Sequence, residues 1–312
     1  MMDKHIEVIG IDHGWSNMKT VSSIFTTGVK EITTEPAFYD NVVESGGVFY
    51  KVGGKRLEVR DTKVENDNFY ILTLASVAKE LDRRGMREAN VLLSVGLPLT
   101  RFGAEKQDFI RYLLRDREAY FRFEKVKYRI RIARVSVFPQ CYAAVADRIR
   151  TFPERAVIVD IGSWTIDIMP IYQYYPDEPE CTTIPQGLIR CMREINEECV
   201  RQIGQELDEN IIQEVMSGGK GTLPQQYMEI IEGCLEKFAE KVLNTLKEHG
   251  YNLDVTPIIF VGGGATVMKL FGHTGSGNIQ YIEDIRANAK GYEYLGRAYL
   301  LSNRKTVEAG IG

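Results

Sequence analysis

The chain has 312 residues, of which 44% are hydrophobic and 26% charged, and its formal net charge is −4 at pH 7. This length is sufficient for two domains with separate hydrophobic cores, and the composition is that of a globular protein rather than a disordered or fibrous one. The negative charge excludes a general electrostatic attraction to nucleic acid or to an anionic membrane.

Membrane spans, disulfides and zinc sites are not indicated. No stretch reaches the roughly 18 to 20 apolar residues that a span requires, and the apolar run at 6–11 is too short for a signal peptide. The five cysteines contain no Cys-x-x-Cys pair, and the four histidines are not spaced as metal ligands. We therefore expect a cytoplasmic protein with reduced cysteines and no membrane contact.

Two hairpins are expected near the N-terminus. The apolar run at 6–11 ends in a turn and is followed by a β-rich run at 18–24, which predicts strand, turn and strand. A second hairpin is predicted at 48–57, where Gly53 and Gly54 can supply the positive φ angles of a two-residue turn.

Helices and strands alternate through the rest of the first half. The spacing of apolar residues predicts, in chain order, a helix at 72–84, a buried strand at 91–95, a helix at 104–117, a strand at 125–137 and a helix at 139–149. The strand at 125–137 alternates basic and apolar residues. We expect a solvated edge strand whose charges prevent unwanted pairing, with contact to nucleic acid or to an acidic patch as the alternative.

The second half begins after residues 151–155, which break the preceding helix. Its expected elements are a strand at 156–159, a strand pair across 160–171, helices at 187–203 and 224–248, a buried strand at 257–261 and a closing helix at 284–301. We predict an α/β protein of two domains. The first is 1–152, with a small subdomain at about 35–75, completed by 284–312; the second is 153–283, with a helical subdomain at about 204–252.

A repeat relates the two halves. Residues 8–19 and 156–167 both contain a buried strand, an Asp-x-Gly turn with polar residues and a second strand. A spacing of about half the chain indicates duplicated domains rather than a solenoid, whose repeats are about 20 to 50 residues long. Two such domains facing each other are expected to form one cleft.

The chemistry of these turns favours a phosphate ligand. A glycine after a strand-end aspartate lets the backbone approach a ligand, and successive N–H groups can form an anion-binding nest. The candidate cofactor-binding residues are Gly14, Trp15, Ser16, Asn17 and Lys19 in the first turn and Gly162, Ser163, Trp164, Thr165 and Asp167 in the second. Asp12 and Asp160 at the turn mouths suit a hydrated Mg²⁺, which keeps several waters and accepts indirect carboxylate contacts.

A third glycine-rich segment follows the strand at 257–261. Its residues Gly262, Gly263, Gly264 and Ala265 would leave a flat surface for adenine and ribose and expose a helix N-terminus. Each of the three motifs by itself is common in turns that bind no ligand, so the interpretation depends on their combination. Neither the P-loop nor the Rossmann glycine pattern occurs, and a nucleotide fold of another kind is needed.

In order and spacing, the three motifs resemble those of the actin, Hsp70 and sugar-kinase superfamily. Segment 10–19 resembles its first phosphate motif, 160–167 its second and 262–265 its adenosine motif. Segments 95–99 and 287–296 are similar to those of bacterial actin-like proteins of the plasmid-segregation (ParM) type. The resemblance covers nearly the whole chain. It implies an actin-like fold, with two duplicated ribonuclease-H-like domains around a nucleotide cleft, each with a smaller subdomain.

The resemblance also implies residue roles. Gln140 matches the family residue that orients the attacking water, and with Asp12 and Asp160 it forms the expected catalytic set. The two aspartates are the expected Mg²⁺ ligands, through water. The residues that depart from the family pattern by being larger than usual are His13, Trp15, Ser163 and Trp164.

The function that the resemblance implies is that of an ATPase whose nucleotide state controls filament assembly, with ATP or GTP and Mg²⁺ as cofactors. The implied partners are other copies of the chain and a DNA-binding adaptor at a centromere-like site, without direct nucleic-acid contact. Two alternatives stay open. One is a small-molecule kinase of the same superfamily, for which the sequence shows no clear acceptor base; the other is a non-polymerising actin-like scaffold.

Overall fold

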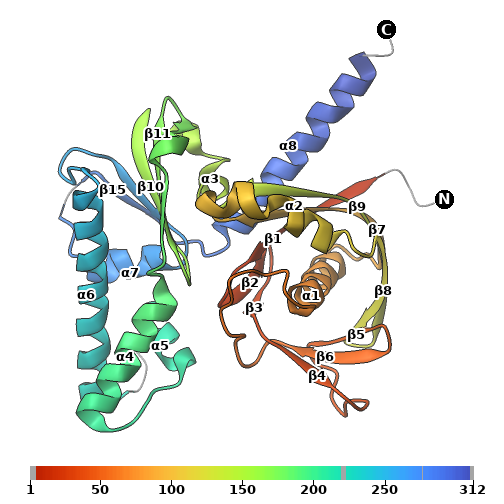
Figure 1. The fold of residues 1–312 in the computed structure, drawn as a ribbon, viewed down its shortest axis with the longest axis horizontal. Coiled ribbons are helices and arrows are strands. Elements are labelled where there is room, and N and C mark those ends of the chain that lie inside the picture. The colour runs from red at the N-terminus through yellow and green to blue at the C-terminus, as the bar shows by residue number, and fades with distance from the viewer. Residues whose placement is uncertain (1–4, 219–222, 276, 310–312) are drawn as a thin grey trace. The chain divides into compact units, whose positions relative to one another are not determined.

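The computed structural model describes residues 5–218, 223–275 and 277–309, and the side chains among them up to residue 302. The chain divides into two compact units: Met1–Asp147 together with Arg286–Gly312, and Arg148–Ile285. Each unit is built around its own sheet (Figure 1). The α/β class expected from the sequence is confirmed. The predicted domain limits at 152 and 284 lie close to these unit limits, and the subdomains stay predictions.

The first unit contains a nine-stranded mixed sheet in the order β3-β2-β1-β7-β9-β8-β5-β6-β4. Its strands are β1 Ile6–His13, β2 Asn17–Thr20, β3 Ile24–Thr26, β4 Val29–Ile32, β5 Val42–Ser45, β6 Val48–Val52, β7 Glu88–Leu97, β8 Glu118–Phe123 and β9 Val126–Pro139. Strand β7 is the centre of the unit, because seven consecutive residues of it are buried and it pairs in parallel with β1 on one side and β9 on the other.

The helices of this unit are α1 Asn68–Arg83, α2 Phe102–Leu113, α3 Tyr142–Val145 and α8 Ala287–Ala309. Helix α1 is amphipathic in sequence but buries twelve of its sixteen residues, because the curved sheet surrounds it (Figure 1). As predicted, it ends before Gly85, which has a φ of +69°. Helix α8 comes from the far end of the sequence and packs on β1 and β7.

Four sequence-based expectations for this unit are wrong in detail. The hairpin turn lies at Gly46 and Gly47, between β5 and β6, and not at Gly53 and Gly54, although all four glycines have positive φ angles. The run at 18–24 is divided into β2 and β3 by a turn. The turn forms because Glu80 accepts hydrogen bonds from both the backbone and the hydroxyl of a serine in it.

The other two corrections concern β9 and the segment after it. Strand β9 shows the predicted alternation of buried and exposed residues, but it is not an edge strand, because it pairs with β7 and β8. The helix expected at 139–149 is reduced to the single turn of α3, because Pro139 still belongs to β9 and a tight turn separates the two.

The second unit contains a six-stranded sheet in the order β12-β11-β10-β14-β15, with β13 paired to β11. Its strands are β10 Arg155–Ile161, β11 Ile166–Tyr172, β12 Tyr175–Pro176, β13 Thr182–Ile184, β14 Ile258–Val261 and β15 Ile279–Ile282. Its helices are α4 Leu188–Ile203, α5 Glu209–Met216, α6 Gln225–Glu248 and α7 Gly264–Phe271. The predicted helices at 187–203 and 224–248 are confirmed to within one residue.

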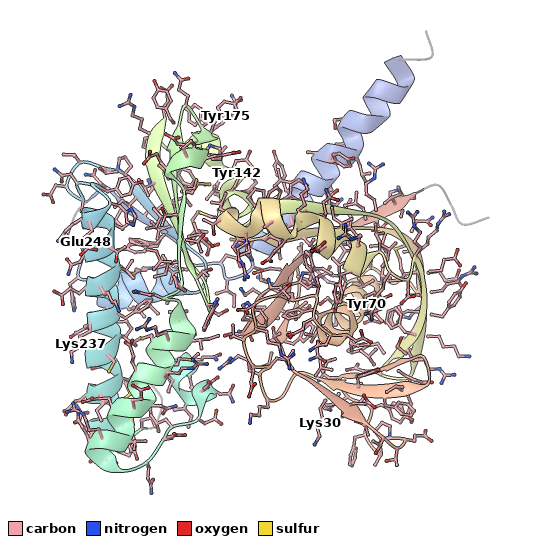
Figure 2. All side chains as sticks on the ribbon, viewed as in Figure 1. Lys30, Tyr70, Tyr142, Tyr175, Lys237 and Glu248 are labelled. Carbon is pink, nitrogen blue, oxygen red and sulfur yellow. The ribbon has the colours of Figure 1, made fainter. Side chains whose placement is uncertain are left out.

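Helix α6 carries a stripe of apolar residues at helical spacing along one face. Its apolar residues, Ile230, Ile231, Leu235, Phe238, Val242 and Leu246, are buried against the rest of the second unit. Its exposed face carries charged residues such as Lys237 and Glu248 (Figure 2). The stripe is therefore core, as its 3.6-residue period predicts.

The two units repeat one strand arrangement. In the first, β1 pairs antiparallel with β2 and in parallel with β7; in the second, β10 pairs antiparallel with β11 and in parallel with β14. The register also matches, because Asp12 lies opposite Lys19 and Asp160 lies opposite Asp167. The repeat seen in the sequence is thus a structural duplication. Among the residues described, no helix is both long and apolar enough to cross a membrane.

Candidate functional site

The first turn loop, between β1 and β2, is held by backbone contacts. Gly14 is required there, because a Cβ at this position would lie 2.6 Å from the carbonyl oxygen of Asn17. Buried Thr27 donates its hydroxyl to the Gly14 carbonyl at 2.7 Å and its N–H to the Ser16 carbonyl at 2.9 Å. Since the C=O and N–H of a trans peptide point in opposite directions, the N–H groups of Trp15 and Asn17 point away from Thr27.

The second turn loop, between β10 and β11, has the same design. The N–H groups of the first residues of α4 and of the glycine before it bond to three consecutive loop carbonyls: Gly187 to Trp164 at 2.9 Å, Leu188 to Gly162 at 3.1 Å and Ile189 to Ser163 at 2.8 Å. The N–H groups of the next loop residues therefore point away from α4. Successive N–H groups with one orientation are what an anion-binding nest requires.

Charged and amide side chains meet at the mouth of the first loop. The Asp12 carboxylate is only 3% exposed; its Oδ2 accepts from Lys19 Nζ at 3.0 Å and its Oδ1 from Gln140 Nε2 at 3.4 Å. Three residues from separate positions in the sequence, all predicted to belong to the site, are thus in contact. The ion pair with Lys19 balances the charge of the buried carboxylate.

Gln140 is positioned by an uncommon backbone turn. The N–H of Tyr142 donates to the Gln140 carbonyl at 2.7 Å, and the residue between them, Cys141, has φ +65° and ψ −59°. This is a γ-turn of the rare, strained type. The N–H of Gln140 bonds to the Leu97 carbonyl at 2.8 Å, which fixes the turn to the end of β7. Strain of this kind concentrates at functional sites, where the surrounding fold maintains it.

In the second unit, Asp160 and the glycine segment after β14 lie together. Gly262 has a φ of +82°, and a Cβ there would lie 2.3 Å from Asp160 Oδ1, so only glycine fits beside this buried carboxylate. Gly264 packs on Ile161 in the same way and begins α7, with Ala265 buried in its first turn. Gly263, the N-cap residue of α7, is half-buried. The strand, glycine run and short helix predicted here are confirmed.

Asp167 supports the second loop from inside. It is 2% exposed, and its Oδ1 accepts a hydrogen bond from Thr183 on the adjacent strand β13. A longer contact of 3.5 Å joins Thr165 Oγ1 to its other oxygen. The structure thus places Asp167 beneath the loop, whereas Ser163 and Trp164 are half-exposed on it.

His13 is part of the core rather than of the ligand-binding surface of the loop. It is fully buried, and its ring lies edge-on to Phe109 at 5.2 Å. Its Nε2 lies 2.9 Å from Thr73 Oγ1, and that hydroxyl donates to the Phe69 carbonyl, so Nε2 must be the donor to Thr73. Burial, and next the nearby charge of Lys63, lower the pKa of His13 from 6.5 to about 3.

This burial predicts acid sensitivity. Because the folded pKa lies below the unfolded one, the unfolded state binds more protons between pH 6.5 and 3, and stability falls as the pH falls through 6.5. We expect His13 to lower the free energy of unfolding by about 2 kcal/mol between pH 7.5 and 5. Urea unfolding of wild type and His13→Gln, which keeps a donor for Thr73, measures this difference. The exposed His249→Gln serves as control, and equal pH dependence in all three proteins would contradict the assignment.

The predicted site residues therefore form one group in each unit. Asp12, Lys19 and Gln140 meet in the first; Asp160 and Gly262 meet in the second. The described residues contain no cluster of three or more His, Cys, Asp or Glu side chains that would hold a metal ion directly.

Three residues that shape the loops are missing from the predicted site. Gly187 marks the start of α4, but its contact with the second loop, 2.6 Å from an ideal Cβ to the Trp164 carbonyl carbon, depends on the fold. Thr27 and Thr183 lie outside any motif and act through hydrogen bonds to the loops. A glycine directly before a helix is the only one of these features that local pattern can detect.

Comparison with known proteins supports the same division of the chain. The family of actin-like protein N-terminal domains matches residues 10–142, and the family of archaeal actin homologues, MreB-like, C-terminal domain, matches residues 158–271. No curated protein sequence matches significantly.

Solved structures share the fold over nearly the whole chain. The archaeal actin homologue Ta0583 has a TM-score of 0.77 at 19% identity, covering 94% of this chain and 100% of its own. ParM of Clostridium botulinum, from a 15-stranded filament, has a TM-score of 0.74 at 17% identity, covering 94% and 99%. Bacillus thuringiensis ParM with AMPPNP has a TM-score of 0.69 at 16% identity, covering 96% and 100%. The chain therefore has the actin-like fold, with an actin-like N-terminal domain over residues 10–142 and an MreB-like C-terminal domain over residues 158–271.

Proposed function

We propose that this protein is an ATPase that assembles into filaments and whose bound nucleotide controls the assembly. The observation that carries the proposal is the duplicated loop geometry: two strand–loop–strand elements with matched register, each with N–H groups oriented for an anion and a buried aspartate at its mouth. The triphosphate binds at these loops, and adenine and ribose bind at the glycine segment 262–265. Of the similar structures, one is described with AMPPNP and another with ADP.

The chain's own groups supply positioning and electrostatic stabilisation, which are the main sources of catalysis in phosphoryl transfer. Lys19 and the loop N–H groups stabilise negative charge that develops on the phosphate oxygens. Gln140, held by the γ-turn, orients the attacking water. The side-chain amide of Gln140 lies beside the buried carboxylate of Asp12, at 3.4 Å from its Oδ1.

The residues present fit Mg²⁺ bound through water. Both oxygens of Asp12 already accept hydrogen bonds, which disfavours direct coordination, and Mg²⁺ retains several waters in most protein sites. When bound, the ion would neutralise phosphate charge. Asp12 and Asp160 would hold its water shell.

Substitution of Asp160 tests the nucleotide site. Asp160→Asn keeps the shape that Gly262 requires and removes the charge, so we expect the protein to fold and to bind Mg²⁺-ATP about tenfold more weakly. Isothermal titration measures the affinity, and Asp254→Asn, at an exposed position of the same unit, is the control. Unchanged affinity together with unchanged turnover would remove this loop from the proposed site.

Filament assembly and its cellular use are a separate part of the proposal. Among the similar structures are filaments, namely the Clostridium botulinum ParM and Alp12. We propose that a DNA-binding adaptor connects the filament to a plasmid, as for segregation proteins. Light scattering after addition of ATP and Mg²⁺, without any acceptor molecule, distinguishes a filament protein from a small-molecule kinase, and phosphate release distinguishes it from a non-hydrolysing scaffold.

A further inference from the structure

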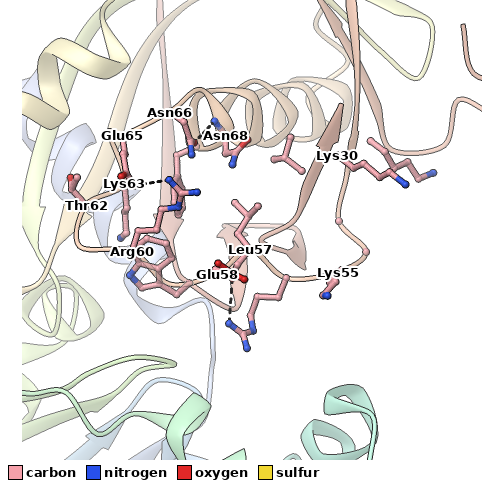
Figure 3. A pocket seen from close by; sticks show the side chains of 17 residues that line it. Lys30, Lys55, Leu57, Glu58, Arg60, Thr62, Lys63, Glu65, Asn66 and Asn68 are labelled. Carbon is pink, nitrogen blue, oxygen red and sulfur yellow. Dashed lines mark hydrogen bonds and ion pairs between the residues drawn. The ribbon is translucent and has the colours of Figure 1, made fainter. Parts of the chain in front are cut away.

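A cavity of about 450 Å³ lies within the first unit, next to the first turn loop but formed mostly by other segments (Figure 3). Its walls come from β4, β6, the segment 53–66 that connects β6 to α1, and the first residues of α1; Trp15 is the residue that it shares with the loop. This volume is within the range of about 300 to 1,000 Å³ typical of small-molecule sites.

The lining of the cavity is strongly basic. Its cationic residues are Lys30, Lys51, Lys55, Arg56, Arg60 and Lys63, whereas its acidic residues are Glu58 and Glu65. The cations outnumber the acids six to two, and one of the acids, Glu65, pairs with Arg60 at 2.8 Å (Figure 3). A surplus of positive charge in a concave site attracts anions and raises their local concentration.

Lys63 is the least expected of these residues. It is only 8% exposed, and within the described part of the chain its ammonium makes no hydrogen bond or ion pair; it lies 5.9 Å from the ring of Phe69. Burial lowers the pKa of Lys63 to about 8, although the charges of Asp12 and Glu105 act in the opposite direction. A buried cation without a direct partner is costly, and such groups are concentrated at functional sites.

Aromatic rings form the wall between the cavity and the loop. Trp15 lies edge-on to Phe69, with ring centroids 5.2 Å apart, and both rings line the cavity. The Trp15 side chain is 8% exposed. Its indole is therefore in position to report on whatever occupies the cavity.

We propose that this cavity binds a phosphate-class oxyanion of two or more negative charges, with Lys63 as its central cation, and that it does so independently of a nucleotide at the turn loops. Phosphate matches the observed lining because lysine and arginine side chains are the usual ligands of this anion. The inference extends beyond the proposed ATPase activity and does not depend on it. Inorganic phosphate and pyrophosphate are the two simplest sources of the group, and binding of either supports the site.

The test uses Trp15 as its reporter. The chain has two tryptophans, so in the Trp164→Phe variant the fluorescence comes from Trp15 alone. We expect a saturable change on titration with pyrophosphate, or with phosphate, in nucleotide-free buffer. Adding Lys63→Met should weaken the affinity at least about tenfold, since it removes a charge-assisted hydrogen bond. Adding Lys127→Met, which removes an exposed lysine of the same unit, should leave the affinity unchanged.

Thermal unfolding supplies a second measurement. In phosphate-free buffer, Lys63→Met should raise Tm relative to wild type, because it replaces a buried, unpaired cation by an apolar side chain of similar length. Pyrophosphate should raise the Tm of wild type and have no effect on the variant. A Tm of Lys63→Met below that of wild type in both buffers would assign Lys63 a structural role instead.

Two further outcomes would overturn the proposal. The first is the absence of any change in Trp15 fluorescence and Tm up to about 10 mM phosphate or pyrophosphate. The second is competitive displacement of pyrophosphate by AMPPNP, seen as loss of the change in Trp15 fluorescence. Pyrophosphate would then occupy the nucleotide site. Binding of AMPPNP itself, measured by equilibrium dialysis, shows separately whether the proposed function stands.

Discussion

Replacing Gln140 by alanine is expected to lower the rate of phosphate release on the order of 100-fold, with nucleotide affinity nearly unchanged. The side chain is half-buried and contacts Asp12, and the γ-turn that carries it is formed by backbone atoms. The substitution therefore removes a positioning group without removing the turn. A loss confined to kcat is typical of an interaction that is made only in the transition state.

The control for this experiment is Gln107→Ala, which removes an exposed glutamine from α2 in the same unit. Turnover is measured as steady-state phosphate release at saturating Mg²⁺-ATP, and affinity by titration with AMPPNP. If Gln140→Ala released phosphate at the wild-type rate, Gln140 would have no part in the reaction. If affinity and turnover fell together, Gln140 would contribute to binding in the ground state.

Replacing Gly291 by alanine is expected to destabilise the first unit by about 2 to 3 kcal/mol. Gly291 lies in α8 where this helix crosses α3, and a Cβ there would lie 1.7 Å from the carbonyl oxygen of Ala143. The obstacle is backbone, so the helices have to separate. Alanine by itself favours a helix by about 1 kcal/mol over glycine, and this gain is too small to offset the clash.

Gly233→Ala provides the matched comparison. Gly233 lies in the middle of α6, and a Cβ there meets no atom within 4 Å. Only the helix preference then acts, and we expect a gain in stability of about 0.5 to 1 kcal/mol. Urea denaturation curves of both variants measure the difference. Equal shifts in the two variants would show that α8 and α3 are not packed as described.

The α8 substitution also has a consequence for the site. Helix α3 follows the γ-turn of Gln140 directly, and α8 supports it from the other end of the sequence. Further contacts hold α8 in place: Arg84 pairs with Glu7 at 2.7 Å and with Glu293 of α8 at 3.0 Å. The position of the candidate catalytic residue thus depends on a helix almost 150 residues away, about half the chain length, and Gly291→Ala should lower turnover as well as stability.

Local pattern was sufficient for the elements whose signals lie in one continuous segment of the chain. The helix before Gly85, the long helix α6 and the buried strands β10 and β14 follow from apolar spacing and end signals. The two Asp-x-Gly loops were recognised because the same local pattern occurs twice. Their residues fix the backbone through contacts only three positions apart, as between Gly14 and Asn17.

Other features depend on partners that are distant in the sequence, and there local pattern fails. Residues 48–57 contain a turn signal at Gly53 and Gly54. The hairpin partner of β6 is nevertheless β5, which precedes β6 in the chain, so the hairpin turn lies at Gly46 and Gly47. The charges of β9 predict an edge strand, because the sequence of a strand does not show which other strands pair with it. In the structure, β7 pairs with one side of β9 and β8 with the other.

The sequence by itself determined the α/β class, the duplicated loops and the glycine segment, because each depends on residues that are neighbours along the chain. Only the tertiary structure decided that His13 is core, that Gln140 contacts Asp12 and that Lys63 is buried in a basic cavity. The physical reason is that burial and electrostatic environment are properties of everything packed around a side chain, and most of those neighbours are far away in the sequence.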